Sequence, residues 1–499
     1  VPGSDQTTIW ASSITYPRVF EHLKFLVQYP HGCLEQTTSG TRPLLFAGDF
    51  LKILSPSLVA SKGGIDTIIR AGIDRILSMQ TPSGGLGYWP GATYPSKWAT
   101  AYATHLLLDA QDRGYAVPAT RLNEILNWME RETKKHHATN RYTVSTTAYL
   151  YYLLARAKRP HNAAATQLLA GIPSDTKGLG AEAAYLLKAA LYLGGDRRHA
   201  NSLRKLDKQS PLYARHLAGS FYSGRRHRGL QLSIFLDLFG HPESIVPIIE
   251  QIAADLSQPS ATYTTQELAW SVTALGKWAI SKATDFVQPT LSINGQTITP
   301  NATSRTSGVS WTIPRASRYD QLALSTSEKV NILVVDEGAL PEADTRSGGQ
   351  GLQISREWLR HDGTPVNLAA IPLGEIIYAR VSLKNTTAKA IQNSAVVDRF
   401  PAGWEIENAS LGHALRPAWI NVAQLWPSEH MNIRDDRIEA FGVIKALSTQ
   451  HLVYALRAVT AGRFKIPAAS VEAMYNPDVW ARELGPLAVV KAPWSSSEE

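Results

Sequence analysis

The sequence has a single cysteine, Cys33, among 499 residues, so no disulfide bond can form within the chain. Stability therefore has to come from packing. One hydrophobic core seldom serves more than about 250–300 residues, so we expect two to four domains. A single thiol also excludes a zinc site with several cysteine ligands, and no His-Glu-x-x-His pattern occurs. We therefore predict that the chain binds no metal.

Long apolar runs are also missing. No segment approaches the roughly 18–20 consecutive apolar residues of a membrane-spanning helix, so we expect no direct membrane contact from this chain. The chain begins at Val1 without an initiator methionine or a charged region before an apolar run. We interpret it as a fragment, and any export signal or lipid anchor would lie upstream.

The net charge is +8, a sign that suits nucleic acid or an anionic surface. The basic residues are nevertheless scattered, with clusters only at Lys134 to His137 and Arg225 to Arg228. No aromatic-rich strand motif accompanies them, so we interpret both clusters as solvated helix ends. The sequence therefore predicts no binding of nucleic acid.

Residues 17–283 have helical periodicity almost throughout. Apolar residues recur at helical spacing, as from Ile65 to Ile76, and we expect about twelve helical segments. Four segments rich in small residues share an Ala-Tyr or Ala-Trp unit and are predicted to be inner helices: residues 98–103, 146–150, 181–186 and 266–271. Helices paired in about six hairpins predict an α/α toroid.

The remainder of the chain has the two-residue period of β-strands. Residues 284–340 contain a predicted hairpin turning at Asn294-Gly295 and three further strands, which are too few for an independent sandwich. Residues 341–351 are a polar connector, and residues 352–499 predict an antiparallel sandwich of six to eight strands. Residues 1–16 are polar and aperiodic, so we expect a connector there.

The only thiol lies in the segment Tyr29-Pro30-His31-Gly32-Cys33-Leu34-Glu35-Gln36. Cys33 and Gln36 are three positions apart, which puts their side chains on one face of a helical turn. Attack of the Cys33 thiolate on the Gln36 carboxamide carbon, with loss of ammonia, would close an internal thioester. Gly32, without a Cβ, permits the tight backbone approach that such a ring needs, and Leu34 would face the core.

This segment resembles the Gly-Cys-x-Glu-Gln thioester signature of the alpha-2-macroglobulin and complement superfamily. Its longer form, Tyr29 to Ser39, most resembles the bacterial alpha-2-macroglobulins. Residues 80–102, with a Gly-Gly pair and the unit Thr-Ala-Tyr, resemble another part of the same thioester domain. Residues 284–340 resemble the C-terminal half of a CUB domain, whose first half would precede the thioester domain and be absent here. Residues 397–408 and 473–477 resemble the C-terminal macroglobulin domain.

The resemblance implies a function. It assigns residues 17–283 to a thioester domain and makes the chain part of a broad-spectrum protease inhibitor. Lysine amines of the target protease would attack the thioester in a single turnover, so the chain is not expected to be an enzyme. The expected partners are the target proteases and the upstream domains of the same polypeptide. The parent protein would be a monomer in the periplasm, anchored to the inner membrane, with no cofactor besides the internal thioester.

A thioester hydrolyses in water and needs cover. The aromatic residues Tyr88, Trp89 and Trp98 are candidates, although a tryptophan on a helical hairpin more often belongs to the core. Resemblance to the family implies that Tyr475, after the flexible Met474, locks over the thioester. The following Asn-Pro is expected to turn the chain and project this loop. Glu35 matches the signature, and its role, helix capping or polarising the site, stays open.

Histidine can divert the chemistry, because an imidazole that intercepts the acyl group frees a thiolate base. His31, His105 and the pair His136-His137 are candidates, but none matches a family motif, so direct aminolysis is predicted. Three other readings of Cys33 stay open. It could be the nucleophile of a Cys-His hydrolase, an inert buried thiol, or part of a toroid that only binds a partner.

Overall fold

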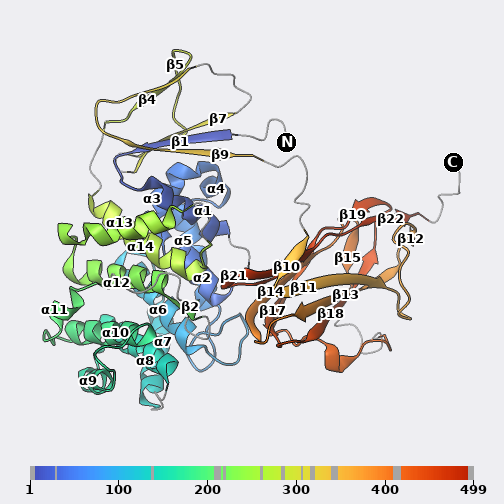
Figure 1. Cartoon of the computed structure of the whole chain (residues 1–499), viewed down its shortest axis with the longest axis horizontal. Helices are drawn as coiled ribbons and strands as arrows, with labels where there is room; N and C mark the ends of the chain where they lie inside the picture. The colour runs from blue at the N-terminus through green and yellow to red at the C-terminus, as the bar shows by residue number, and fades with distance from the viewer. Residues whose placement is uncertain are drawn as a thin grey trace. The chain divides into compact units, whose positions relative to one another are not determined.

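The computed structural model of the chain describes residues 6–28, 31–135, 140–206, 215–216, 221–258, 262–282, 287–304, 307–314, 321–338, 347–407 and 417–492. Contacts between Cα atoms divide the chain into two compact units, Val1–Pro341 and Glu342–Glu499 (Figure 1). Among the described residues, the first unit combines a helical domain with three small β-sheets. The second unit consists of β-sheets.

Six helices form a closed inner ring in the first unit. Each contacts the next in chain order, and the last contacts the first, which closes the ring. The six are α2 (Leu34–Thr41), α6 (Lys97–Asp112), α8 (Arg141–Arg156), α10 (Leu179–Leu193), α12 (Gly224–Phe239) and α14 (Thr265–Lys282). The predicted α/α toroid is therefore confirmed.

Burial separates the inner helices from the outer ones. On α6, all side chains from Trp98 to Ala110 are buried, because alanine and threonine allow neighbours on every side. The outer helix α5 (Ile65–Leu77) buries one face, including Ile69, Ile73 and Ile76. The four segments predicted to be inner lie on α6, α8, α10 and α14. Other helices of this unit are α1 (His22–Gln28), α3 (Leu44–Leu54), α4 (Pro56–Ser61), α7 (Ala119–Lys134), α9 (Asn162–Ala170), α11 (Ala200–Leu203) and α13 (Val246–Leu256).

The interpretation of Arg225 to Arg228 as a solvated helix end is wrong. These residues begin the inner helix α12, and all four are buried. Arg225 pairs with Asp255 at 2.6 Å, and Arg226 pairs with Glu182. Carboxylates on neighbouring helices compensate the buried charges, and a sequence pattern on α12 alone does not reveal those partners.

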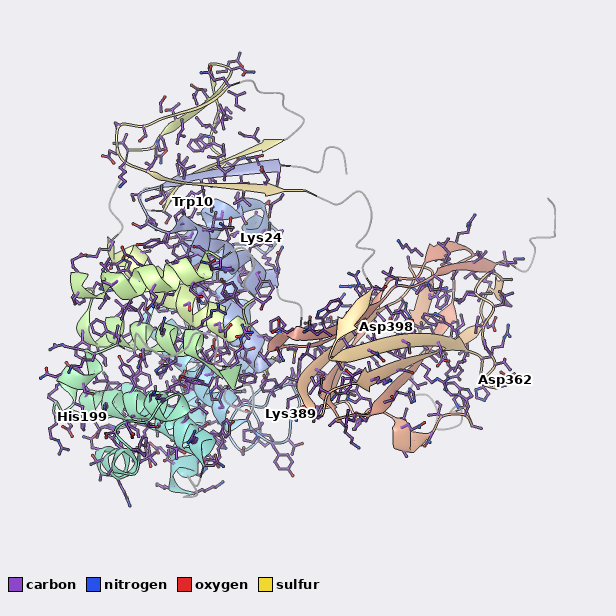
Figure 2. All side chains as sticks on the ribbon, viewed as in Figure 1. Trp10, Lys24, His199, Asp362, Lys389 and Asp398 are labelled. Carbon is purple, nitrogen blue, oxygen red and sulfur yellow. The ribbon has the colours of Figure 1, made fainter. Side chains whose placement is uncertain are left out.

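The prediction that residues 1–16 form a connector is also wrong. Strand β1 (Gln6–Ser12) lies between β7 (Gly308–Pro314) and β9 (Asn331–Glu337) in an antiparallel sheet of order β6-β7-β1-β9, with β6 at Ala302–Ser304. Ile9, Trp10 and Ala11 are buried, and Trp10 lies on the side of the strand toward the helices (Figure 2). A strand of the sheet thus precedes the helical domain in the chain.

The predicted hairpin at Asn294-Gly295 is confirmed. Strands β4 (Thr290–Ile293) and β5 (Gln296–Thr297) pair across this turn, and β8 (Leu322–Ser325) completes a three-stranded sheet. Asn294 and Gly295 have φ angles of 49° and 80°. Both values are left-handed, as a two-residue hairpin turn of this kind requires.

The second unit contains three β-sheets. Their strand orders are β10-β21-β20-β14-β17-β16, β11-β13-β18-β15 and β12-β22-β19. The described residues therefore contain more strands than the six to eight that we predicted. The bounds are β10 (Gly348–Gln350), β11 (Leu352–Leu359), β12 (Ile371–Pro372), β13 (Ile376–Asn385), β14 (Ile391–Arg399), β15 (Trp404–Ile406), β16 (His430–Ile433), β17 (Arg437–Ile444), β18 (Thr449–Ala458), β19 (Gly462–Lys465), β20 (Ala469–Ala473), β21 (Asn476–Glu483) and β22 (Leu487–Lys491).

The core of the second unit lies between its sheets. Long central strands such as β13 and β18 alternate buried and less buried residues, which gives a clear two-residue period in the sequence. Strand β21 has few buried side chains, so its apolar alternation is weak. None of the helices in the described parts of the chain has the length and apolar character needed to cross a membrane.

Candidate thioester site at the start of helix α2

The sequence motif lies at the N-terminus of α2. Cys33 is the N-cap residue, in an extended conformation, and Leu34 begins the helix. Gly32 before it has a φ of 68°, a left-handed value that favours glycine, so the chain turns sharply into the helix. The Gly32 carbonyl accepts hydrogen bonds from Thr37 Oγ1 and Arg75 Nη2, both at 3.3 Å. Tyr29 and Pro30 lie outside the described residues.

Cys33 and Gln36 form a reciprocal cap. The Gln36 backbone N–H donates to Cys33 Sγ at 3.4 Å, and the Cys33 backbone N–H donates to Gln36 Oε1 at 3.4 Å. Cys33 is fully buried and Gln36 nearly so. The arrangement has the pattern of a capping box, with a thiol in place of the usual hydroxyl. It brings the sulfur and the carboxamide to the same side of the first turn.

Glu35 points into the ring. Its fully buried carboxylate accepts hydrogen bonds from Ser39 Oγ at 2.5 Å, Thr265 Oγ1 at 2.9 Å and Gln266 Nε2 at 2.6 Å. Since Cys33 and Gln36 make the helix cap, capping is not the role of this side chain. Burial and the Glu35 carboxylate together raise the pKa of Tyr102, whose hydroxyl lies 3.0 Å from Ser39 Oγ.

The glycine-rich loop at residues 80–91 borders the motif. The Leu34 N–H donates to the Tyr88 carbonyl at 3.0 Å, which joins this loop to the first residue of α2. Trp89 is buried and packs edge-on against Tyr88, with ring centroids 6.3 Å apart. Of the predicted shielding residues, Tyr88 and Trp89 therefore lie on a loop that contacts the site.

Trp98 belongs to the core of the ring. It stacks on Tyr102 one turn further along α6, with centroids 5.3 Å apart, and packs against Phe221 at 4.7 Å. Leu34 is fully buried as well. The position of Trp98 agrees with the core interpretation that a tryptophan on a helical hairpin favours.

A buried ionic cluster continues from α2 into the centre of the ring. Arg42 pairs with Asp109, which also accepts from Arg156 Nη1 at 2.5 Å. Burial would raise the pKa of Asp109, but these two guanidinium groups lower it far below its ordinary value. Burial, and then Arg42, hold the pKa of His105 well below its ordinary value.

The candidate histidines do not form one group. His105 is fully buried on α6, and its Nδ1 lies 2.9 Å from the Tyr149 hydroxyl. His31 is buried beside Gly32 in the motif. His136 and His137 lie outside the described residues. A neutral, buried His105 bonded to a tyrosine has the features of a structural histidine.

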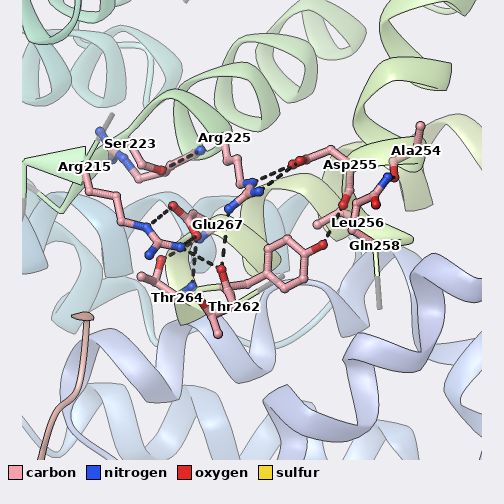
Figure 3. A network of polar contacts seen from close by, with 12 residues as sticks. Arg215, Ser223, Arg225, Ala254, Asp255, Leu256, Gln258, Thr262, Thr264 and Glu267 are labelled. Carbon is pink, nitrogen blue, oxygen red and sulfur yellow. Dashed lines mark hydrogen bonds and ion pairs between the residues drawn. The ribbon is translucent and has the colours of Figure 1, made fainter. Parts of the chain in front are cut away.

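A polar network that the sequence did not reveal surrounds the start of α14 (Figure 3). Arg215 contacts both carboxylate oxygens of Glu267 at 2.9 Å, and its Nη2 donates to the Thr262 carbonyl at 2.8 Å. Arg225 binds Asp255 with two hydrogen bonds. The partners are 30 to 52 residues apart in the sequence, so no local pattern joins them.

Met474 and Tyr475 form the turn between β20 and β21 in the second unit, where Ala473 pairs with Asn476. The Met474 N–H donates to the Asn393 carbonyl at 3.1 Å. Asn476 and Pro477 begin strand β21 rather than turning the chain, which corrects the expected role of the Asn-Pro pair. The two residues before them turn the chain instead.

Within the described residues, no three or more His, Cys, Asp or Glu side chains are grouped so that they could hold a metal ion. The buried acids already described are bound by arginine or by hydroxyl and amide donors.

Comparisons with known proteins agree with this arrangement. The family model described as the A-macroglobulin TED domain matches residues 12–139, and the bacterial alpha-2-macroglobulin MG10 domain matches residues 351–478. The alpha-2-macroglobulin of Escherichia coli (strain K12) is 25% identical over 491 residues, covering 92% of this chain and 28% of the relative. That of Xylella fastidiosa (strain Temecula1) is 26% identical over 484 residues, covering 91% and 28%.

Solved structures share the fold. Native E. coli alpha-2-macroglobulin, from domain MG7 to the C-terminus, has a TM-score of 0.74 at 22% identity, covering 98% of this chain and 78% of that one. A structure of Salmonella alpha-2-macroglobulin has a TM-score of 0.74 at 23% identity, covering 98% and 32%.

A closed helical ring with Gly-Cys-Leu-Glu-Gln at the start of an inner helix, followed by antiparallel β-sheets, defines the class of macroglobulins that contain a TED domain. Within that class, the chain corresponds to the C-terminal region of a bacterial alpha-2-macroglobulin. It spans 28% of the length of the E. coli and Xylella relatives.

Proposed function

We propose that Cys33 and Gln36 form an internal thioester and that the chain is the reactive part of a protease trap. The observation that carries this proposal is the reciprocal cap, in which the Cys33 sulfur and the Gln36 carboxamide lie on one side of a buried helical turn. The closeness of Gln36 gives the thiol an acyl partner within its own helix. Proximity of this kind favours an intramolecular reaction strongly.

The proposed chemistry has two steps. The Cys33 sulfur bonds to the Gln36 carboxamide carbon, the C–N bond breaks, and ammonia leaves with the thiol proton. Later a lysine amine of the target attacks the same carbon, an amide forms, and the C–S bond breaks. Cys33 then holds a proton as a free thiol. Since the acyl group is used once, the protein is an inhibitor with a single turnover rather than an enzyme.

The remaining parts of the proposal concern the whole protein. Cleavage of a bait segment in upstream domains would expose the thioester, which would then couple the attacking protease covalently. The protein would be a monomer that acts in bacterial defence, in the periplasm, anchored to the inner membrane. It would need no cofactor besides the thioester itself. Similarity to the bacterial alpha-2-macroglobulins supports these points.

Cover for the thioester would come from two sources. The loop that carries Tyr88 and Trp89 contacts α2 and would shield the first turn from one side. The turn at Met474 and Tyr475 would supply a removable cover, because a two-residue hairpin turn places both side chains at the end of the paired strands β20 and β21. A removable cover suits a bond that has to stay dry until cleavage.

The first experiment is an intact-mass measurement with and without methylamine. A Salmonella relative has been crystallised after reaction with this amine. We expect native protein to have the mass of its residues less one ammonia and to show no reactive thiol. Methylamine should release one thiol and label Gln36, whereas Cys33→Ala should neither lose ammonia nor take up the amine.

The same experiment separates the alternatives. A Cys-His hydrolase would show full mass, a titratable thiol and repeated turnover of acyl substrates. A toroid that only binds partners, or an inert buried thiol, would show full mass and no change with methylamine. Labelling of Gln36 in the Cys33→Ala protein would also contradict the proposal.

A further inference from the structure

We propose that Thr265 and Gln266, at the first turn of α14, are positioning residues for the Cys33–Gln36 pair and act through the Glu35 carboxylate. This inference rests on the proposed thioester. The residues concerned are separated by about 230 positions in the sequence, and closure of the ring between α14 and α2 brings them together.

Helix α2 cannot set its own geometry. It has eight residues, and a helix this short is not stable in water without tertiary contacts. Its reactive residues occupy the N-cap and the first turn, where backbone groups lack partners within the helix and fraying begins. The distance between the sulfur and the carboxamide therefore depends on what the rest of the domain holds against this turn.

Helix α14 holds the first turn of α2 through the side chain of Glu35. Both carboxylate oxygens of Glu35 lie 2.9 Å from Thr265 Oγ1, and Oε1 accepts from Gln266 Nε2 at 2.6 Å. Gln266 Nε2 also donates to Ser39 Oγ at 3.2 Å, which extends the contact by one turn of α2. Glu35 stands between the two reactive residues in the chain, so fixing its side chain fixes the backbone on both sides.

The first turn of α14 is itself firmly held. Thr264 N–H donates to the Glu267 carboxylate at 3.0 Å, and that carboxylate is paired with Arg215. Arg225 and Arg215 both donate to the Thr262 carbonyl, and Tyr263 Oη donates to the Asp255 carbonyl (Figure 3). Hydrogen bonds to charged groups in a buried site are stronger than neutral ones, so α14 presents Thr265 and Gln266 on a rigid support.

The experiment compares three threonine variants of the full chain. Thr265→Val removes the hydroxyl that binds Glu35 and keeps the shape of the side chain, while Thr265→Ser keeps a hydroxyl. Thr273→Val is the matched control, because Thr273 lies two turns further along α14, is fully buried, and its hydroxyl has no hydrogen-bond partner among the described residues. The readouts are spontaneous thiol release in buffer, and hydrogen exchange of peptides that cover α2.

We expect Thr265→Val to release its thiol about tenfold faster than wild type, because it loses a hydrogen bond to a carboxylate. Exchange in the first turn of α2 should be faster too, while Thr265→Ser and Thr273→Val stay within about twofold. The proposal is overturned if Thr265→Val matches Thr273→Val in both readouts. It is also overturned if Thr265→Ser is as fast as Thr265→Val, since a retained hydroxyl would then give no protection.

Failure of the proposed function gives a different result. If wild-type protein shows full mass and a free thiol, the thioester is wrong and the positioning role falls with it. If wild type has the thioester but all three variants show the same thiol release and hydrogen exchange, the proposed function stands and the role of Thr265 does not.

Discussion

At the scale of single residues, burial decides what the charged groups of the ring do. The carboxylate of Asp109 is buried, and it is bound by Arg42 and Arg156. The Arg42 guanidinium also lies over the Trp270 ring, 4.0 Å from its centroid. Arg42 follows α2 directly, so this cluster anchors the end of the helix opposite to the candidate thioester.

Replacing Asp109 should destabilise the first unit strongly. Asp109→Asn leaves the buried Arg42 guanidinium without its carboxylate and leaves Arg156 with Asp112 alone, so we expect the free energy of unfolding at pH 7 to fall by about 3–5 kcal/mol. Asp112→Asn is the control, because its carboxylate also pairs with Arg156 but is exposed, and it should cost less than about 1 kcal/mol. Urea unfolding of both variants measures the difference.

The effect of Asp109→Asn should depend on pH. Burial acts to raise the pKa of Asp109, but Arg42 and Arg156 lower it below the unfolded value of about 3.9. The ionised carboxylate therefore stabilises the folded state above that value, and this contribution is lost as the pH falls below it. The gap between wild type and Asp109→Asn should shrink between pH 5 and pH 3, and an unchanged gap would contradict the assigned ion pair.

At the scale of elements, the strand before the helical domain is the clearest case of structure that tertiary pairing creates. β1 pairs on both edges, with β7 and with β9. Trp10 is fully buried, donates from Nε1 to the Ser307 carbonyl at 2.9 Å, and packs against Phe20 and Phe50. The strand therefore joins the small sheet to the helices that follow it.

Trp10→Ala should remove this link. Loss of a buried tryptophan costs about 3–5 kcal/mol, so the thermal midpoint of the first unit should fall by several degrees. Val334→Ala on the neighbouring strand β9 is the control, since Val334 is 56% exposed and its loss should change stability by less than about 0.5 kcal/mol. Equal midpoints for the two variants would mean that β1 is not part of the folded core.

At the scale of the whole molecule, the two units have separate cores. In the proposed function, the first unit would carry the thioester and the second would supply its removable cover. The second unit has its own buried polar group, in which Asp398 binds Arg356 and accepts from Tyr454 Oη at 2.5 Å. Its hairpin turn at Met474 and Tyr475 is therefore built on a domain with its own stability. Release of the proposed cover would therefore not require the helical ring, which has its own core, to unfold.

Tyr475→Gly tests the proposed cover. Because Tyr475 is only 2% exposed, its replacement should also lower stability, so thiol release is measured well below the unfolding midpoint. Under that condition we expect Tyr475→Gly to speed spontaneous thiol release several-fold, because water would reach the bond more easily. Tyr475→Phe keeps the ring and should behave like wild type. Unchanged release kinetics in folded Tyr475→Gly protein would remove Tyr475 from the site.

The sequence by itself determined the elements whose physical cause is local. Helical periodicity from Ile65 to Ile76, small residues on the inner helices and the Asn294-Gly295 turn each depend on neighbouring residues, so each was predictable. The spacing of Cys33 and Gln36 on one helical turn is local in the same sense, and the cap that joins them followed from it.

Only the tertiary structure decided which distant residues meet. Thr265 and Gln266 contact Glu35 because the ring closes between α14 and α2, and no pattern within either helix specifies that contact. The arginines at 225–228 are buried because Glu182 and Asp255 come from other helices, and β1 is a strand because β7 and β9, about 300 residues later, pair with it. Burial and strand pairing are properties of the assembled chain, so a local sequence pattern does not contain them.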